Sequence, residues 1–317
     1  MVLAVLAVLA AAVLFGTTGT AQALGPESAT PLSVGSVRLL VGGTALALIA
    51  ALAGWRRSAS ASAGTERPRR RLRMAEVGLA LVTGVCLLAY QPLFFLGTER
   101  NGVAVGTVIA LGAAPVLAGL LEWAVRRAAP RGTWLTATGL ATAGVALLAV
   151  GGRQGVGGEG ASALDPVGLL GSLGAGASFA IIAVAQRRLL DRGWHPLSAV
   201  GAMAGIAAFG AVFTVLSTDV SWLADPSGIA MALWLGLATI TVAYALFTTG
   251  LSRLTAATAA TLTLGEPLTA SILGVVVLGE QLTALAVTGL LVLAAGLALL
   301  AWGSRAPRDP VPFAVEG

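Results

Sequence analysis

Lysine is absent from the 317 residues, and cysteine and histidine occur once each, as Cys86 and His195. A nucleotide-binding P-loop needs its lysine to reach the phosphates, so ATP hydrolysis by this chain is not expected. One cysteine cannot form a disulfide within the chain, and one cysteine with one histidine cannot build a Cys/His zinc site. We therefore expect no metal and no cofactor. Cys86 should be a packing residue, and His195 a solvated residue between two apolar runs.

Charged residues are also scarce, at 10% of the chain, whereas about 25% is usual in soluble proteins. Hydrophobic residues make up 57%, and the mean hydropathy is +0.91. This composition predicts an all-α polytopic membrane protein. Ten apolar runs are each long enough to cross a bilayer, for which about 20 residues suffice. They cover residues 2–24, 31–54, 74–98, 101–125, 133–151, 166–189, 196–217, 227–250, 254–280 and 282–302.

The first run ends in Ala21-Gln22-Ala23, which has the form of a signal-peptidase site. No positively charged region precedes this run and it is long for a signal sequence, so we count it as a membrane span. Of nineteen arginines, sixteen fall in alternate connecting segments and tails, two lie on the opposite side and one is inside a span. We expect a multi-pass protein of the bacterial plasma (inner) membrane, and the positive-inside rule predicts that both termini are cytoplasmic.

The longest basic segment, residues 55–73, lies between two predicted spans and lacks interleaved aromatic residues. A cytoplasmic loop facing anionic lipid is therefore favoured over a nucleic-acid site, and we expect no nucleic-acid partner. The lipid bilayer itself is the expected surrounding of the chain.

An internal repeat appears when the sequence is shifted by 152 residues, which aligns Pro115 with Pro267, Ala114 with Glu266, and Phe95 with Phe247. Each copy holds five spans, and an odd number forces the second copy to enter the membrane inverted. We predict ten helices in two inverted five-helix repeats. Residues 1–151 form the first, 152–165 a Gly-rich linker, 166–303 the second and 304–317 a cytoplasmic tail.

Glu266-Pro267 stands in the middle of the ninth run. An ionised acid at that depth costs roughly 2.5 kcal/mol or more, and proline frees the carbonyl of Thr263 and kinks the helix. Pro115 should kink the fourth span in the same way. A charge beside a kink at membrane depth is typical of a transport site at the interface of two inverted repeats.

Two short motifs of the second copy, Leu264-Gly265-Glu266-Pro267 and Leu278-Gly279-Glu280-Gln281-Leu282, resemble elements of EamA-type members of the drug/metabolite transporter superfamily. Arg38-Leu39 resembles an arginine that the first copy often carries. The resemblance implies ten helices, alternating access and transport of small metabolites, with amino-acid and drug exporters among bacterial members. The first copy departs from the pattern, since it has Ala114-Pro115 and, further on, Val125-Arg126-Arg127.

Glu266 is the leading candidate for the site, either as a protonatable group that couples substrate to a proton or as a ligand for a cationic group. The alternative is a structural acid that stays protonated. Arg38 is a candidate for docking an anionic group, because a guanidinium grips a carboxylate bidentately. Its alternatives are a fixed ion pair or an arginine that reaches the outer interface. Other polar or aromatic residues within spans are candidates for lining the cavity: Tyr90, Gln91, Tyr244, Gln22 and Trp234.

Two further acids lie near predicted span ends. Glu280, at the outer end of the ninth span, is a candidate gate residue. Glu122 precedes Arg126 by four residues, which predicts an ordinary helical ion pair near the cytoplasmic surface.

Together these features predict a secondary active transporter that exports a small-molecule substrate. A flippase of the same fold for lipid-linked substrates is the near alternative. An intramembrane lipid-modifying enzyme is the alternative of another class, but only Glu266 lies near the midplane, so we expect no enzyme. If a homodimer forms, the uniformly apolar fifth and tenth spans are its expected contact.

Overall fold

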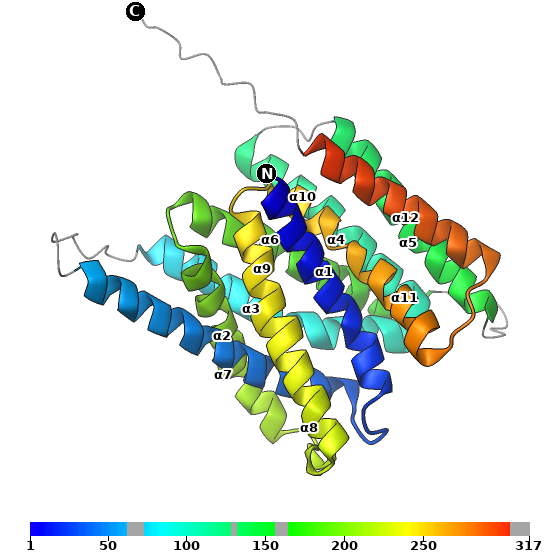
Figure 1. Ribbon diagram of the computed structural model, residues 1–317, viewed down its shortest axis with the longest axis horizontal. Helices are drawn as coiled ribbons and strands as arrows, with labels where there is room; N and C mark the ends of the chain where they lie inside the picture. Colours follow the sequence, from blue (N-terminus) through cyan, green and yellow to red (C-terminus); the bar gives the residue numbers. More distant parts are fainter. Residues whose placement is uncertain (62–72, 128–131, 156–163, 305–317) are drawn as a thin grey trace, which may run out of the picture.

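The computed structural model describes residues 1–61, 73–127, 132–155 and 164–304 (Figure 1). Within these ranges all regular structure is helical, and ten segments are long and apolar enough to cross a membrane. The expected all-α fold with ten spans is confirmed. Most of the basic segment, the Gly-rich linker and the tail lie outside the described residues, and the expected division of the chain at these places stays a prediction.

Eight spans are single helices: α1 Val2–Ala23, α2 Pro31–Ala61, α3 Met74–Asn101, α4 Val103–Arg126, α5 Gly132–Gly155, α6 Pro166–Asp191, α7 Pro196–Leu216 and α12 Ala284–Gly303. The eighth span consists of α8 (Pro226–Leu233), the π-helical segment η2 (Trp234–Val242) and α9 (Ala243–Leu251). The ninth consists of α10 (Ala256–Leu262) and α11 (Gly265–Leu278), and a short 3₁₀ turn η1 (Ser221–Ala224) precedes α8.

The break in the ninth span lies where the sequence predicts it. Pro267 has no N–H to donate to Thr263, and the Thr263 carbonyl instead accepts from the Glu266 N–H at 2.9 Å. The Leu264 N–H bonds the Thr261 carbonyl at 3.1 Å, a tighter i→i+3 turn. Pro115, in contrast, lies inside α4 without interrupting it, so the expected kink there does not break the helix.

The helix contacts repeat between the two halves. The contact of α3 with α6 is matched by the contact of its equivalents, η2 and α9, with α1. The contact of α4 with α6 is matched by that of α11 with α1, and the contact of α3 with α7 by that of η2 with α2. The pairs α2–α7 and α5–α12 join equivalent helices of the two copies and lie on opposite sides of the bundle (Figure 1). These three contacts thus have their counterparts, as the inverted-repeat architecture requires.

The pair formed by α5 and α12 is closely packed through glycine. A Cβ at Gly144 would overlap the backbone of Leu293, and one at Gly289 would overlap the backbone of Leu148. Small residues of this kind let membrane helices approach each other closely. The fifth and tenth spans therefore bury one face against each other, and a homodimer contact through their outer faces stays a prediction.

Candidate functional site

A cavity of about 100 Å³ lies between the two halves of the bundle. Both copies of the repeat line it, and the lining includes both Ala114 and its repeat equivalent Glu266. Six of the seven residues singled out in the sequence face this one cavity: Gln22, Arg38, Tyr90, Gln91, Tyr244 and Glu266. The cavity extends along α1 from Phe15 to Gln22, one residue before the helix ends.

Trp234 does not belong to this set. Its side chain is 49% exposed, and its indole N–H donates to the Thr17 hydroxyl at 3.0 Å. Trp234 opens the π-helical segment, whose i→i+5 bonding changes which face of the span each following residue occupies. The position of a residue in an apolar run does not reveal which face of the span its side chain occupies.

Arg38 faces the cavity from α2 and is joined to Gln91 of α3. With its amide oxygen turned to the guanidinium, Gln91 accepts hydrogen bonds from Arg38 Nη2 at 2.6 Å and from Nε at 3.1 Å. Across the described ranges, no carboxylate forms an ion pair with Arg38. Its partner is thus a neutral amide, which leaves the positive charge uncompensated by direct contact with an acid.

Glu266 faces the same cavity from the first turn of α11. A carboxylate at a helix N-terminus is stabilised by the helix dipole. Among the residues that the structure describes, none donates a hydrogen bond to the Glu266 carboxylate. The backbone at this point is held tightly, because a Cβ at Gly16 of α1 would overlap the Glu266 carbonyl and Thr269. The side chain is therefore fixed at its base and free at its carboxylate.

Aromatic rings form much of the remaining wall. Phe15 and Tyr244 meet edge to face with centroids 5.2 Å apart, and Tyr90 stacks on Phe94 at 5.9 Å. Phe179 lies 6.5 Å from Tyr90. Such rings offer apolar contact area, and their faces also attract cations. The phenylalanines were not predicted as site residues, since nothing in an apolar run distinguishes a lining phenylalanine from a packing one.

The other singled-out residues lie away from the cavity. Glu280 is exposed beyond the end of α11, where its N–H bonds the Gly274 carbonyl at 3.0 Å, and a gate role stays a prediction. Cys86 packs against the main core cluster, as expected. His195 caps α7 by accepting from the Leu197 N–H at 3.2 Å, and partial burial and Arg57 together lower the pKa of its imidazole. Within the described ranges, no cluster of three His, Cys, Asp or Glu residues could hold a metal ion.

Comparison with known proteins agrees with this architecture. Residues 2–150 and 166–302 each match the EamA-like transporter family. The chain belongs to this family. A relative from Bacillus subtilis (strain 168), the uncharacterized transporter YwfM, is 40% identical over 246 residues, which cover 77% of this chain and 75% of the relative. A solved structure, described only as the crystal structure of a protein, superposes with a TM-score of 0.76 at 19% identity, covering 95% of this chain and 97% of the other.

The EamA-like chain is therefore a multi-pass membrane transporter of the drug/metabolite transporter kind. The two family matches coincide with the two sets of five spans, and the cavity lies between them. Both the family and the relative's name point to a transporter.

Proposed function

We propose that this chain is a secondary active transporter in the bacterial inner membrane that exports small metabolites, such as amino acids or drug-like compounds, by alternating access. The observation that carries the proposal is the charge pattern of the cavity. Arg38 of the first copy and Glu266 of the second copy face one space, and neither is paired with an opposite charge among the described residues. A transported molecule that carries both an anionic and a cationic group can pair with both charges.

The geometry favours a zwitterionic or cationic amphipathic substrate. A substrate carboxylate would exchange with the Gln91 amide as the partner of Arg38, for which a guanidinium offers a bidentate fork. A substrate ammonium group would bind the Glu266 carboxylate. The aromatic rings of Phe15, Tyr90 and Tyr244 would contact the apolar part of the molecule.

Proton coupling follows from the same arrangement. When no cationic group occupies the site, the Glu266 carboxylate accepts no hydrogen bond from the described residues, so a proton is the ion that best neutralises it. When the substrate arrives, its ammonium takes over that role and the proton leaves. One carboxylate that binds proton and substrate alternately is sufficient for exchange of the two across the membrane.

A flippase for lipid-linked substrates is the second candidate, because the same fold and the same apolar cavity wall suit an amphipathic molecule with a polar head. The two candidates differ in the ligand that binds at Arg38 and Glu266. A soluble amino acid or drug-like cation fits the first, whereas the second needs a lipid tail.

A thermal-shift screen of the purified chain against amino acids, drug-like cations and lipids tests the proposal. A ligand present at a hundredfold excess over Kd and bound only to the folded state adds about 2.7 kcal/mol of stability. We expect a soluble ligand whose shift disappears in Glu266→Gln and in Arg38→Gln but persists in Glu280→Gln, the matched acid outside the cavity. Shifts confined to lipids, or equal in all variants, would contradict the proposal.

A further inference from the structure

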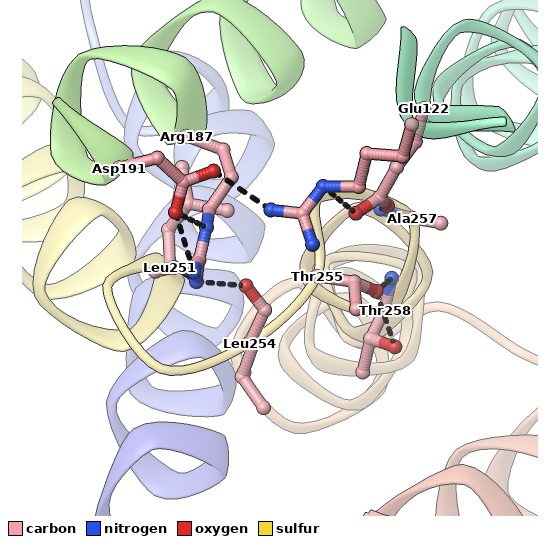
Figure 2. Close-up of polar contacts among 9 residues, drawn as sticks. Glu122, Arg187, Asp191, Leu251, Leu254, Thr255, Ala257 and Thr258 are labelled. Carbon is pink, nitrogen blue, oxygen red and sulfur yellow. Dashed lines mark hydrogen bonds and ion pairs between the residues drawn. The ribbon is translucent and has the colours of Figure 1, made fainter. Parts of the chain in front are cut away.

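A cluster of four charged residues connects the two copies at one end of the bundle, away from the cavity. It consists of Glu122 and Arg126 on α4 of the first copy, and Arg187 and Asp191 on α6 of the second. Arg126 Nη2 bonds Asp191 Oδ2 at 2.7 Å, which is a direct ion pair between the halves. Figure 2 shows the labelled members of the cluster and the loop that they hold.

The cluster also binds the backbone between α9 and α10. Arg187 Nη1 donates to the carbonyls of Leu251 at 2.9 Å and Leu254 at 2.7 Å, while the Ala257 N–H donates to Glu122 Oε2 at 2.9 Å (Figure 2). The charged side chains thus hold α4, α6 and the start of α10 together. A small space of about 150 Å³ lies among them, lined also by Val184 and Ala256.

A layer of alanine separates this cluster from the central cavity. Ala118, Ala180 and Ala260, all fully buried, pack together from α4, α6 and α10. Along α4, Glu122, Ala118 and the cavity residue Ala114 follow at intervals of one helical turn. The route from the cavity to this end of the bundle therefore passes through the alanine layer and then through the cluster, and both must part for it to open.

The equivalent contact at the other end has no such cluster. In the inverted repeat the counterpart of α4–α6 is the contact between α1 and α11. α1 contains no charged side chain, and the only one in α11 is Glu266, which faces the cavity. There Gly16 packs directly on Thr269. This end of the route is closed by ion pairs, whereas the α1–α11 contact holds none among the described residues.

The pairing within the cluster suits repeated opening. Glu122 and Arg126 pair within α4 at 3.4 Å, and Arg187 and Asp191 pair within α6 at 2.7 Å, each at i,i+4 spacing. If α4 and α6 separate, the bonds between the halves break while every charge retains a partner on its own helix. The main cost of breaking an ion pair is the charge left without a partner. The pairs within α4 and within α6 avoid this cost when the helices separate, which a permanently closed contact would not require.

We infer that Glu122, Arg126, Arg187 and Asp191 form an ion-paired gate that opens and closes the end of the bundle at α4, α6 and α10 during transport. The inference rests on the proposed alternating access and names the residues that shift the equilibrium between the closed and open states of this end. The Arg126–Asp191 pair stabilises the state in which this end is closed and the cavity extends toward the far end of α1.

Thiol labelling tests the gate without any substrate. In a Cys86→Ala background, Val184→Cys reports on the space beside the cluster and Thr18→Cys on the central cavity along α1. Reaction rates with a membrane-impermeant maleimide are measured on the purified full chain with Arg126 intact, with Arg126→Gln and with Arg127→Gln. Arg127 is an adjacent exposed arginine with no ion pair among the described residues, and it serves as the matched control.

Arg126→Gln should speed labelling of Val184→Cys about fivefold and slow labelling of Thr18→Cys, which is the shift that the loss of one partly exposed ion pair produces. Arg127→Gln should change neither rate. Unchanged rates in Arg126→Gln, or faster labelling at both reporters as in local loosening, would overturn the inference. If Arg126→Gln does not fold, Asp191→Asn removes the same pair and must give the same opposite changes. Because no ligand is added, a wrong substrate or coupling ion leaves this result unaffected.

Discussion

At equivalent positions of the repeat, the first copy carries Ala114-Pro115 inside the unbroken helix α4, and the second carries Glu266-Pro267 at the junction of α10 and α11. Both Ala114 and Glu266 line the cavity. Proline is present in both copies, so proline alone does not explain why only one helix is interrupted. The comparison teaches that the architecture is symmetric while the charges of the cavity are not, because the first copy contributes Arg38 and the second contributes Glu266.

A second difference separates α3 from its counterpart, the eighth span. α3 is one helix through Pro92, whereas the eighth span contains the nine-residue π-helical segment η2. The segment packs on α2, where Thr241 donates its hydroxyl to the Gly42 carbonyl at 2.9 Å. Gly42 is one turn from Arg38, so the irregular segment helps to fix the helix that brings the positive charge to the cavity.

Making the first copy resemble the second should have the largest effect on stability. Ala114→Glu places a second acid in the cavity that already holds Glu266, and an ionised acid at that depth costs about 2.5 kcal/mol or more. Unfolding of the purified chain in denaturant at neutral pH should show a loss of that size. Ala114→Gln, which has the same shape without the charge, should lose clearly less. Equal losses would mean that space, and not charge, limits this position.

The close contact between α2 and the π-helical segment offers a smaller test. A Cβ at Gly42 would overlap the Gly236 carbonyl and Ile240, so Gly42→Ala should destabilise by about 1–3 kcal/mol through overpacking. Gly78→Ala on α3 meets no atom within 4 Å and is the matched control. It should be neutral or stabilise by about 0.5–1 kcal/mol, since glycine is unfavourable within a helix. An unchanged free energy of unfolding in Gly42→Ala would show that η2 can move away from α2 without loss of stability.

The helix starts of the two copies should differ slightly in their response to acid. Asp165 caps α6 by accepting from the Gly168 N–H at 2.8 Å, whereas the equivalent helix α1 has no side-chain cap. That hydrogen bond, with Arg100 at 3.5 Å, lowers the pKa of the Asp165 carboxyl. Its contribution is therefore complete above the unfolded pKa of about 3.9 and is lost as the pH falls through the lower folded pKa.

The thermal midpoint measured from pH 7 to pH 3 tests this assignment. Asp165→Asn keeps an acceptor for the cap and removes the titration, so its deficit relative to the natural chain should be present at pH 7 and shrink at the acid end. A deficit in thermal midpoint that does not change with pH would show that Asp165 contributes through the fit of its side chain and not through its charge.

Much of the fold could be predicted from the sequence, because each span is a continuous apolar run. The arginines predict the orientation of the runs, and the alignment of Pro115 with Pro267 predicts that they form two copies of five. Six cavity residues were predicted because polar side chains are costly in contact with lipid and therefore face the interior of the bundle or a cavity. Trp234 lies outside this set, because its side chain is half exposed and donates to the Thr17 hydroxyl. The aromatic wall was missed, since Phe15 and Phe179 resemble packing residues in any apolar run.

The charged gate was only half predicted. The spacing of Glu122 and Arg126 on one helix predicted their ion pair, and the structure contains it at 3.4 Å. Their bonds to Asp191 and to the Ala257 N–H join segments more than sixty residues apart. Such contacts depend on how two copies of the repeat pack, and no local pattern in a single sequence contains that information.

Proton-coupled transport through Glu266 tests the central claim most directly. Purified chain in liposomes, loaded with a ligand identified by thermal shift, is given a pH gradient, and ligand flux is followed in the natural protein, in Glu266→Gln and in Glu99→Gln, an exposed acid at the end of α3. We expect flux that follows the gradient in the natural chain and in Glu99→Gln. In Glu266→Gln it should fall about 10- to 100-fold, as the loss of a hydrogen bond to a charged group predicts. Full, gradient-dependent flux in Glu266→Gln would contradict the account.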